Sequence, residues 1–482
     1  MKYILDHEGK PYRKFFEEIA AIPHESFHEK ALSDYIVNFA KERGLWHHQD
    51  EVWNVIIHKP ASAGYETHEP VMIQGHIDMV CVKTPESDHD FDVDPLELYV
   101  KDGFLRARGT TLGADCGHGI SYMLAILDDD TLKHPPLECL FTVQEEVGIG
   151  GPKHLDYSLL HAKRMIATDS MGEGAPELST TSVLGGRYQK SVAFEPVDAG
   201  DFYQVEIGGF AGGHAAVDIN KGRGNAIKIA ARAAFHLLEK AELRLCTFSG
   251  GTLKNNIPQQ AEFVFWTKPE MQQTLPAVID QLNQDLQQEF AKTDDMPCIR
   301  IRLTKPHSSA LSLKQTKELV HWMMGIPSGT YLASPQEPAF PLTSRNLGTA
   351  ILKERVFELG YMYRTSIASH IKMLFDEQAV LSELYGAVWE EEYQYPGYSV
   401  EPGTPMYETY AAVYRELSGK ELTPIHIHAG TDVGTIIQGM GGTMDVVGIG
   451  PNTRKFHTPE EELELASYDR VYQYIINVLE RL

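Results

Sequence analysis

The chain has 482 residues, 43% of them hydrophobic and 23% charged, and a formal net charge of −24 at pH 7. This length is too great for one hydrophobic core, so two or three domains are expected, and the composition is that of an ordinary globular protein. The charge disfavours nucleic acid and anionic membranes as partners, because both repel an acidic surface.

The N-terminal residues MKYILDHEGKPYRKFF lack the apolar run of a signal peptide, and no later stretch is long and apolar enough to predict a membrane span. The five cysteines are few, odd in number and without CxxC spacing, which argues against a disulfide framework and a structural zinc knuckle. We therefore expect a cytoplasmic protein with reduced thiols.

Helical periodicity runs over residues 15–43 and is broken at IPHES. Residues 113–127 pass from a glycine-rich turn into an apolar helix, between two predicted strands. Three apolar runs are typical of buried strands and end in carboxylates: residues 70–78, 135–146 and 163–170. The pattern predicts a parallel or mixed α/β sheet, in which ligands gather at the carboxyl ends of the strands.

The pattern changes from about residue 187, where a strand and turn, an amphipathic helix over 226–241 and further strands and helices indicate a separate α+β domain. Residues 392–405 resemble a linker, and more α/β material follows. The prediction is a catalytic α/β domain with a mixed, mainly parallel sheet, interrupted by an inserted α+β domain: residues 1–186 with 393–482, and residues 187–392.

Two segments carry candidate metal ligands. His76 and Asp78 lie two apart on an expected strand, so they share a face, and a carboxylate can hold the second ring nitrogen of a metal-bound histidine. A structural histidine fits the same pattern. Asp115 lies in the glycine-rich turn, where it could bridge two cations through its two oxygens or simply cap the helix.

Three more acidic residues and a second histidine extend this set. Glu145 and Glu146 directly follow an apolar strand, and adjacent residues on a strand point to opposite sides, so one could bind a metal while the other acts as general base. Paired glutamates at a strand end are often only exposed. Asp169 ends another strand, and His457 lies in the loop KFHTPEE. Together these side chains supply the oxygen and nitrogen donors that suit zinc.

Several motifs in order resemble those of the aminoacyl-histidine dipeptidases, the peptidase D group: GHIDMV, TTLGADCGHGI, QEEVGIGG, ATDS, GGHA and GPNTRKFHTPEE. This group belongs to the two-zinc peptidases that include carnosinase, tripeptidase T and carboxypeptidase G, and the resemblance covers nearly the whole chain. It implies a two-zinc catalytic domain with an inserted lid domain, a short peptide substrate, and Mn²⁺ or Co²⁺ as substitute metals. Relatives are often dimers, so a homodimer is one expected arrangement.

The resemblance also implies a role for each metal-binding candidate. Asp115 would bridge the two zinc ions, with His76 and Asp169 completing one site. Glu146 and His457 would complete the other site.

Further roles concern the reaction and the substrate. Glu145 would be the general base, and Asp78 would orient His76. His214, in GGHA, would help to bind the substrate carbonyl or the oxyanion. Arg364, in YMYRTS, would meet the substrate carboxylate with its planar fork, and a surface salt bridge is the competing interpretation.

Other lid positions and three departures from the family pattern bear on the substrate. Asn256, with Ser344 and Asn346, would be a supporting polar group. HAGTDVG replaces the usual HAGLECG, so the acid expected to meet the free amine of the substrate is Asp432, one methylene shorter. Cys116 stands where Asn, Asp or Gly is common, and its thiol could be a metal ligand, an oxidation point or packing. IPHES also replaces IPRPS.

The function predicted is that of a cytoplasmic zinc-dependent dipeptidase for Xaa-His-type dipeptides. The nearest alternative is an N-acyl amino acid amidase or carboxypeptidase of the same fold. A metal-binding scaffold without catalysis is a third interpretation, against which the presence of Glu145 argues.

Overall fold

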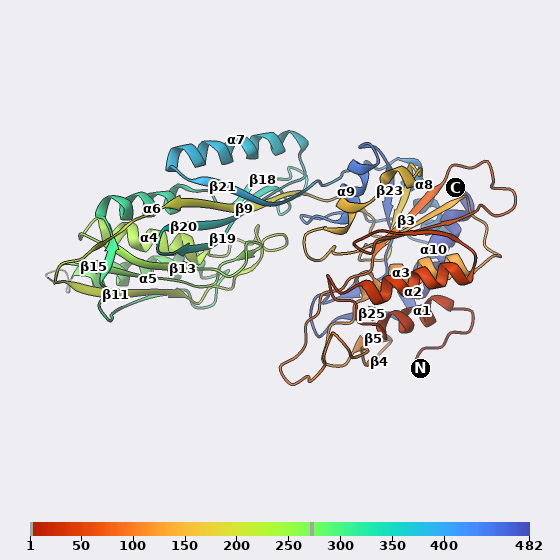
Figure 1. Ribbon diagram of the computed structural model, residues 1–482, viewed down its shortest axis with the longest axis horizontal. Helices are drawn as coiled ribbons and strands as arrows, with labels where there is room; N and C mark the ends of the chain where they lie inside the picture. Colours follow the sequence, from red (N-terminus) through yellow and green to blue (C-terminus); the bar gives the residue numbers. More distant parts are fainter. Residues whose placement is uncertain (1–2, 270–273) are drawn as a thin grey trace. The chain divides into compact units, whose positions relative to one another are not determined.

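The structure is a computed structural model that describes residues 3–269 and 274–482. It contains two compact units: Met1–Thr180 with Tyr395–Leu482, and Thr181–Gln394 (Figure 1). The first boundary falls at residue 180 and not at 186, because β9 (Ser182–Ser191) pairs along its whole length with β20 (Val356–Thr365) of the second unit.

The first unit is built on a six-stranded sheet. In sheet order its strands are β1 (Trp46–Gln49), β2 (Val55–Lys59), β6 (Leu137–Thr142), β3 (Val71–His76), β7 (Arg164–Ala167) and β23 (Asp445–Gly448). Strand β3 pairs in parallel with β6 and β7, and β7 with β23, whereas β1 and β2 join antiparallel. The mixed, mainly parallel sheet expected from the sequence is confirmed.

Both faces of this sheet are buried. Along β2, Val55 and Ile57 belong to one hydrophobic cluster and Ile56 to another, as the alternation of side chains along a strand requires. The larger cluster includes five helices: α1 (Pro11–Ala20), α2 (Lys30–Glu42), α3 (Ala114–Asp128), α8 (Pro405–Ser418) and α10 (Leu465–Arg481). Helix α9 (Asp432–Gly439) covers the other face. Burial on both sides explains why these strands are almost continuously apolar.

The central strands end earlier than the sequence indicated. The last paired residues of β3 and β6 are His76 and Thr142, so Asp78 and Glu145 lie on the loops that follow. The predictions that His76 and Asp78 share a strand face and that Glu145 and Glu146 alternate along a strand were therefore wrong. Gln144 has a positive φ of 57°, which turns the chain before the two glutamates.

Smaller sheets complete the first unit. One has the strand order β24 (Thr453–Arg454), β25 (Glu462–Glu464), β5 (Phe104–Ala107) and β4 (Leu98–Lys101), and another joins β8 (Glu177–Ser179) to β22 (Ile425–His426). Two 3-10 helices also occur, η1 (Gly151–His154) and η2 (Tyr157–Leu159). The β25–β5 pairing brings the loop before α10 beside the segment that leads into α3.

The second unit is an α+β structure. Its large sheet has the order β16 (Cys298–Leu303), β11 (Asp201–Gly208), β15 (Ala261–Thr267), β13 (Arg244–Gly250), β19 (Pro341–Leu352), β20, β9 and β21 (Val388–Tyr395), with β18 (Gly329–Ala333) beside β19. The pairings from β16 to β9 are all antiparallel. Short pairs join β10 (Phe194–Pro196) to β17 (Ser309–Leu311) and β12 (Gly213–His214) to β14 (Asn256–Ile257).

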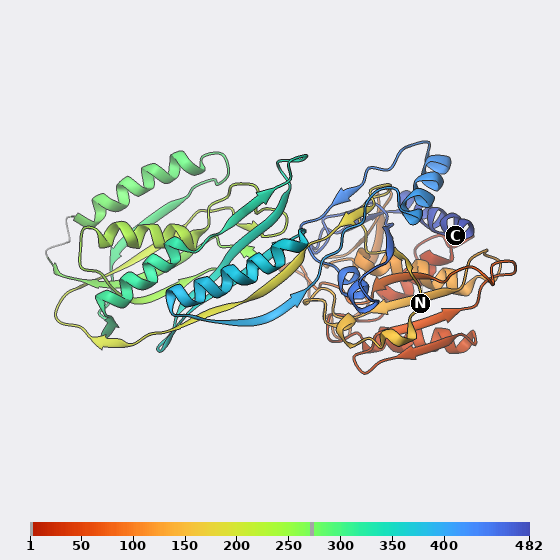
Figure 2. The ribbon, with the colours of Figure 1, turned by 90° about the horizontal axis from the view of Figure 1, so that it is seen from above.

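The core of the second unit lies between this sheet and its helices. These are α4 (Ala226–Leu238), α5 (Thr274–Phe290), α6 (Leu313–Gly325) and α7 (Ala368–Tyr385), which contribute to a single hydrophobic cluster with the strands. Helix α4 packs against both α5 and α6, and Figure 2 shows the helices over the sheet. Across the described part of both units, no helix is long and apolar enough to cross a bilayer.

Candidate metal centre

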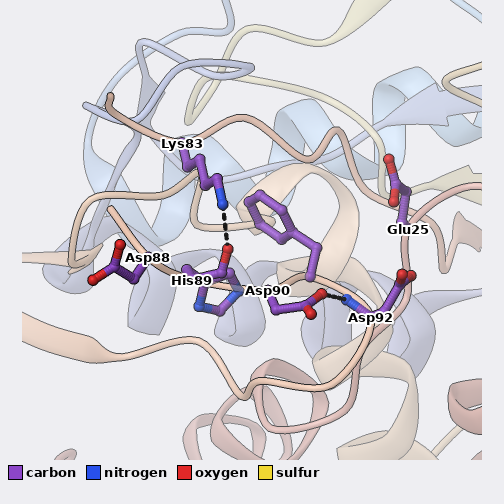
Figure 3. A pocket seen from close by; sticks show the side chains of 7 residues that line it. Glu25, Lys83, Asp88, His89, Asp90 and Asp92 are labelled. Carbon is purple, nitrogen blue, oxygen red and sulfur yellow. Dashed lines mark hydrogen bonds between the residues drawn. The ribbon is translucent and has the colours of Figure 1, made fainter. Parts of the chain in front are cut away.

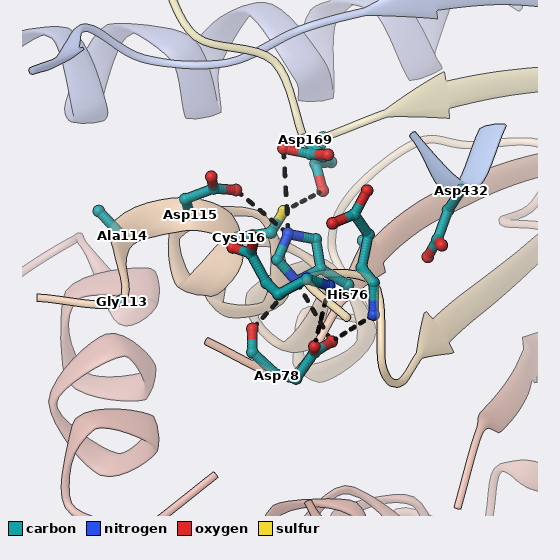
Figure 4. A network of polar contacts seen from close by, with 12 residues as sticks. His76, Asp78, Gly113, Ala114, Asp115, Cys116, Asp169 and Asp432 are labelled. Atoms are coloured by element: carbon teal, nitrogen blue, oxygen red, sulfur yellow. Dashed lines mark hydrogen bonds and ion pairs between the residues drawn. The ribbon is translucent and has the colours of Figure 1, made fainter. Parts of the chain in front are cut away.

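Asp115 contacts both histidines of the cluster in the first unit, and Figure 4 shows its carboxylate directed at His76. Its Oδ1 lies 3.1 Å from Nε2 of His76, and its Oδ2 lies 3.2 Å from Nε2 of His457. The side chain can reach both rings because Asp115, near the start of α3, departs from helical geometry with φ −87° and ψ 105°. Each carboxylate oxygen therefore faces a different histidine.

The other two predicted ligands divide between these histidines. Oε1 of Glu146 lies 2.9 Å from Nε2 of His457, and Oδ1 of Asp169 lies 4.0 Å from Nε2 of His76. The donors thus form two groups with Asp115 between them, which is the division that the family resemblance implies. Five side chains meet here, from three separate loops, the start of α3 and the end of β3.

Asp78 was expected to orient His76 through its carboxylate, but its backbone carbonyl is closer to the ring. Nδ1 of His76 lies 3.0 Å from the backbone carbonyl of Asp78 and 3.5 Å from its carboxylate, so the carbonyl is the nearer acceptor for this ring N–H. The carboxylate accepts instead from the hydroxyl of Ser26 at 2.7 Å and from the backbone N–H groups of Glu145 and Glu146 at 3.0 and 3.2 Å. Asp78 therefore anchors the loop of the two glutamates beside His76.

The electrostatics of the cluster fit cations. Burial, aided by Asp115, raises the pKa of Asp169 well above its ordinary value, and burial also raises the pKa of Glu146. Burial would raise the pKa of Asp115 as well, but its hydrogen bonds with His457 and His76 hold it well below the usual range. Mostly buried carboxylates crowded beside two imidazoles offer the oxygen and nitrogen donors that a pair of divalent ions takes.

Glu145 lies beside the candidate metal ligands. Ligand atoms of Glu145, Glu146 and His76 fall within 4.8 Å of one another. Burial raises the pKa of Glu145 well above its ordinary value, with the carboxylates of Glu146 and Asp432 adding to the effect and His76 opposing it. A carboxylate with a raised pKa accepts a proton more readily than an exposed one.

Cys116 is brought to the same cluster. Its Sγ falls within 4.8 Å of donor atoms of His76 and Asp169, and burial raises the pKa of the thiol. The hydroxyl of Thr168 donates to the carbonyl of Gln74 at 2.8 Å and lies 3.5 Å from Sγ. The thiol proton therefore points to Thr168, as expected for a packed, neutral cysteine.

Asp432, the first residue of α9, is only 1% exposed. Its Oδ2 accepts from the hydroxyl of Thr142 and lies 3.4 Å from Nε2 of Gln74, while Oδ1 is buried with no hydrogen-bond partner among the described residues. Burial raises the pKa of Asp432 to about 7. An acceptor atom is thus left available on a buried carboxyl group.

The remaining predicted residues belong to the second unit. His214 and Asn256 are register partners in the β12–β14 pair, and Nδ1 of His214 accepts from the backbone N–H of Ala216 at 3.2 Å. The side-chain amide of Asn346 donates to the carbonyl of Asn256 at 2.7 Å, so β19 is tied to this pair. Nε2 of His214 lies 3.5 Å from the side-chain amide nitrogen of Asn255.

Arg364 lies on β20, directly opposite Ser344 of β19. It is 5% exposed, and its Nε and Nη1 have no hydrogen-bond partner in the described parts of the chain. The competing interpretation of a surface salt bridge is therefore wrong, because the side chain is buried and its donors remain available. Such donors are costly to leave unpaired, and a planar anion would satisfy two of them.

A separate cavity of about 360 Å³ opens on the first unit and is lined by residues that the sequence analysis did not single out (Figure 3). Lys83 donates to the carbonyl of His89 at 2.6 Å, and Nδ1 of His28 lies 3.0 Å from Asp92. The alternating aspartates of DHDFDVD, residues 88–94, were the available signal for this acidic rim. None of the five proposed metal ligands lines it.

Comparison with known proteins identifies the family. Residues 72–481 match the model of peptidase family M20/M25/M40. The cytosol non-specific dipeptidase of Escherichia coli is 31% identical over 98% of both chains. The aminoacylhistidine dipeptidase of Vibrio alginolyticus has a similar structure, with 30% identity, a TM-score of 0.84 and coverage of 98% of this chain and 96% of that one. A tripeptidase from Staphylococcus aureus shares the fold, at 16% identity, a TM-score of 0.50 and 98% coverage of both chains.

The protein is therefore a metallopeptidase, a hydrolase of peptide bonds. It belongs to peptidase family M20/M25/M40. The resemblance inferred from the motifs is confirmed.

Proposed function

We propose that this protein is a cytoplasmic dipeptidase that uses two Zn²⁺ ions and hydrolyses Xaa-His-type dipeptides. The observation that carries the proposal is Asp115, whose two carboxylate oxygens each face a different histidine. The names of the two relatives near 30% identity, a cytosol non-specific dipeptidase and an aminoacylhistidine dipeptidase, support the substrate class and the compartment. Mn²⁺ and Co²⁺ are proposed as substitutes, because the donors are histidines and carboxylates.

In this proposal Asp115 bridges the ions. His76 with Asp169, and Glu146 with His457, hold one ion each. When bound, such ions lower the pKa of a water molecule and polarise the peptide carbonyl. The buried, acidic character of the cluster supports this assignment, because removing charges from water is favourable only when they are paired.

Glu145 moves the proton in the proposed reaction. Its carboxylate accepts a proton from the attacking water and then donates the same proton to the departing amine, so the proton is neither gained nor lost over the cycle. The raised pKa of Glu145 supports both steps, since the group can hold the proton between them. Asp78 keeps Glu145 in place through the backbone N–H of that residue.

Four residues are proposed to recognise the substrate. Arg364 binds its carboxylate, which the two available donors of the buried guanidinium support. His214 stabilises the oxyanion, and Asn256, its register partner, assists. Asp432 receives the free amine, and its unpartnered Oδ1 supports this role. A homodimer is proposed from the relatives alone, and sedimentation equilibrium of the purified protein tests it.

Metal removal and a substrate panel test the proposed function. Protein stripped of metal with a chelator is expected to regain activity when Zn²⁺ is added. Mn²⁺ or Co²⁺ is expected to restore an activity equal to or lower than that with Zn²⁺. The panel compares Xaa-His dipeptides, other dipeptides, tripeptides and N-acyl amino acids by kcat/KM. Highest values for N-acyl amino acids would identify an amidase instead, and no recovery with any of the three metals would exclude the metallopeptidase mechanism.

A further inference from the structure

One carboxylate binds three successive backbone N–H groups immediately before Asp115. Glu461 accepts from Leu112 at 2.7 Å and from Gly113 at 3.1 Å through Oε2, and from Ala114 at 2.9 Å through Oε1. Its side chain is buried, with 3% of Glu461 exposed. Figure 4 shows Gly113 and Ala114 leading into Asp115.

This turn needs an external partner. The first N–H groups of a helix have no acceptor within the helix, and a side chain at the start of the helix usually supplies one. Here Gly113 is in the left-handed region with φ 67°, no side-chain cap is present at that position, and Asp115 turns its carboxylate to the two histidines. Glu461 therefore supplies the acceptors that the local sequence does not.

Glu461 belongs to the loop that carries His457. That loop is otherwise at the surface, since residues 454–458 are exposed and the side chain of His457 is 41% exposed. Regular pairing resumes only at β25, which begins at Glu462. The buried Glu461 side chain is thus the point at which the loop of His457 is attached to the turn of Asp115.

We propose that Glu461 is a positioning residue, which holds Asp115 and His457 at the spacing that lets them bind the same metal ion. The inference rests on the proposed assignment of these two residues as ligands. It predicts that Glu461 determines metal affinity although it touches no ion. Second-sphere hydrogen bonds of this kind typically change metal affinity about 10- to 100-fold.

Glu461→Gln tests the proposal with little change of shape. Glutamine offers one acceptor oxygen, and its NH₂ group faces backbone donors that it cannot satisfy. Titration of metal-free protein with Zn²⁺ by calorimetry is expected to show two ions in the wild type and, in the variant, an affinity for one of them reduced about 10- to 100-fold. Circular dichroism checks that the variant is folded before metal is added.

Glu462→Gln is the matched control, because Glu462 is the next residue but pairs with Arg106 instead of the turn. It is expected to bind both ions with wild-type affinity. Wild-type affinity for both ions in Glu461→Gln would overturn the proposal. Equal weakening in the two variants would also overturn it, since the effect would then be a general loss of stability.

Hydrogen exchange of the wild-type protein keeps the proposal testable if Glu461→Gln does not fold. The amides of Leu112, Gly113 and Ala114 are expected to be protected in metal-free protein as well as with Zn²⁺, and rapid exchange in the metal-free form would refute positioning by Glu461. Asp115→Asn tests the proposed ligand set independently of the role of Glu461. Two ions bound by that variant at wild-type affinity would refute the ligand set itself, whatever peptide the enzyme cleaves.

Discussion

The two units treat their candidate functional groups differently. In the first unit, Asp115 already contacts His76 at 3.1 Å and His457 at 3.2 Å, and the three residues come from segments far apart in the chain. In the second unit, the candidates lie on antiparallel strands, and the buried Arg364 has two donors without a partner among the residues that the structure describes. The difference indicates that folding alone brings the candidate metal ligands of the first unit together, whereas two donors of Arg364 in the second unit have no partner among the described residues and stay available to a ligand.

Among these predictions, the largest effect is expected from the loss of Glu145, the proposed base of the first unit. Glu145→Ala is expected to lower kcat about 10²- to 10⁴-fold, because proton transfer from water is lost, while the metal content stays near the wild-type value. Steady-state kinetics with an Xaa-His dipeptide and elemental analysis measure both quantities. Glu97→Ala, which removes an exposed partner of Arg108, is the control and should leave both unchanged. Joint loss of metal and activity in Glu145→Ala would give this residue a ligand role instead.

Substitution of Arg364 tests whether the second unit recognises the carboxylate of the substrate. Arg364→Lys keeps the charge but loses the planar fork, so kcat/KM for a dipeptide is expected to fall about 10- to 100-fold, with bound metal unchanged. The corresponding dipeptide amide lacks the carboxylate, and the variant and the wild type should hydrolyse it at similar rates. An equal loss for the dipeptide and its amide would argue against recognition of the carboxylate by Arg364.

Metal removal should separate the stabilities of the two units. A ligand stabilises only the folded state that binds it, by about 2.7 kcal/mol at a concentration of 100 Kd. Calorimetry with and without Zn²⁺ is expected to show one transition that shifts with metal and one that does not. Leu319→Ala, in the core of the second unit, should lower only the metal-independent transition. A single transition that responds to both changes would show that the units unfold together.

The smallest expected effect is on stability, and it concerns the ion pairs that link the N-terminal and C-terminal helices of the first unit. Asp469 of α10 accepts from Lys10 at 2.7 Å and from Arg13 of α1 at 2.7 and 2.9 Å. Burial opposes its ionisation, but these hydrogen bonds outweigh the burial and hold the pKa of Asp469 below its ordinary value. Asp469→Asn is expected to cost about 1 to 2 kcal/mol at neutral pH.

The sign of the pH dependence follows from that lowered pKa. A carboxyl group whose folded-state pKa is depressed stabilises the fold above its unfolded pKa and loses this contribution as the pH falls through the folded value. Urea unfolding at a series of pH values should therefore show the difference between wild type and Asp469→Asn shrinking below about pH 4. A difference that stays constant down to pH 2 would exclude the ionised network as its source.

Prediction from the sequence was most successful where a local pattern carries the information. The apolar run before His76 and the glycine-rich turn before Asp115 indicated a strand and a helix, and both are confirmed. Strand ends were misplaced, because pairing and not apolar character decides where a strand stops, as the last register pair His76–Thr142 shows. The boundary at residue 186 failed for the same reason, since it cut through β9.

By itself, the sequence determined the family, the mainly parallel sheet with an inserted unit, and the residue types available for a metal pair. These depend on motifs and periodicity that are readable along the chain. Only the tertiary structure decided that each oxygen of Asp115 faces its own histidine, that Arg364 is buried with donors to spare, and that Glu461 holds the turn before Asp115. Such contacts join residues up to hundreds of positions apart, and packing alone brings them together.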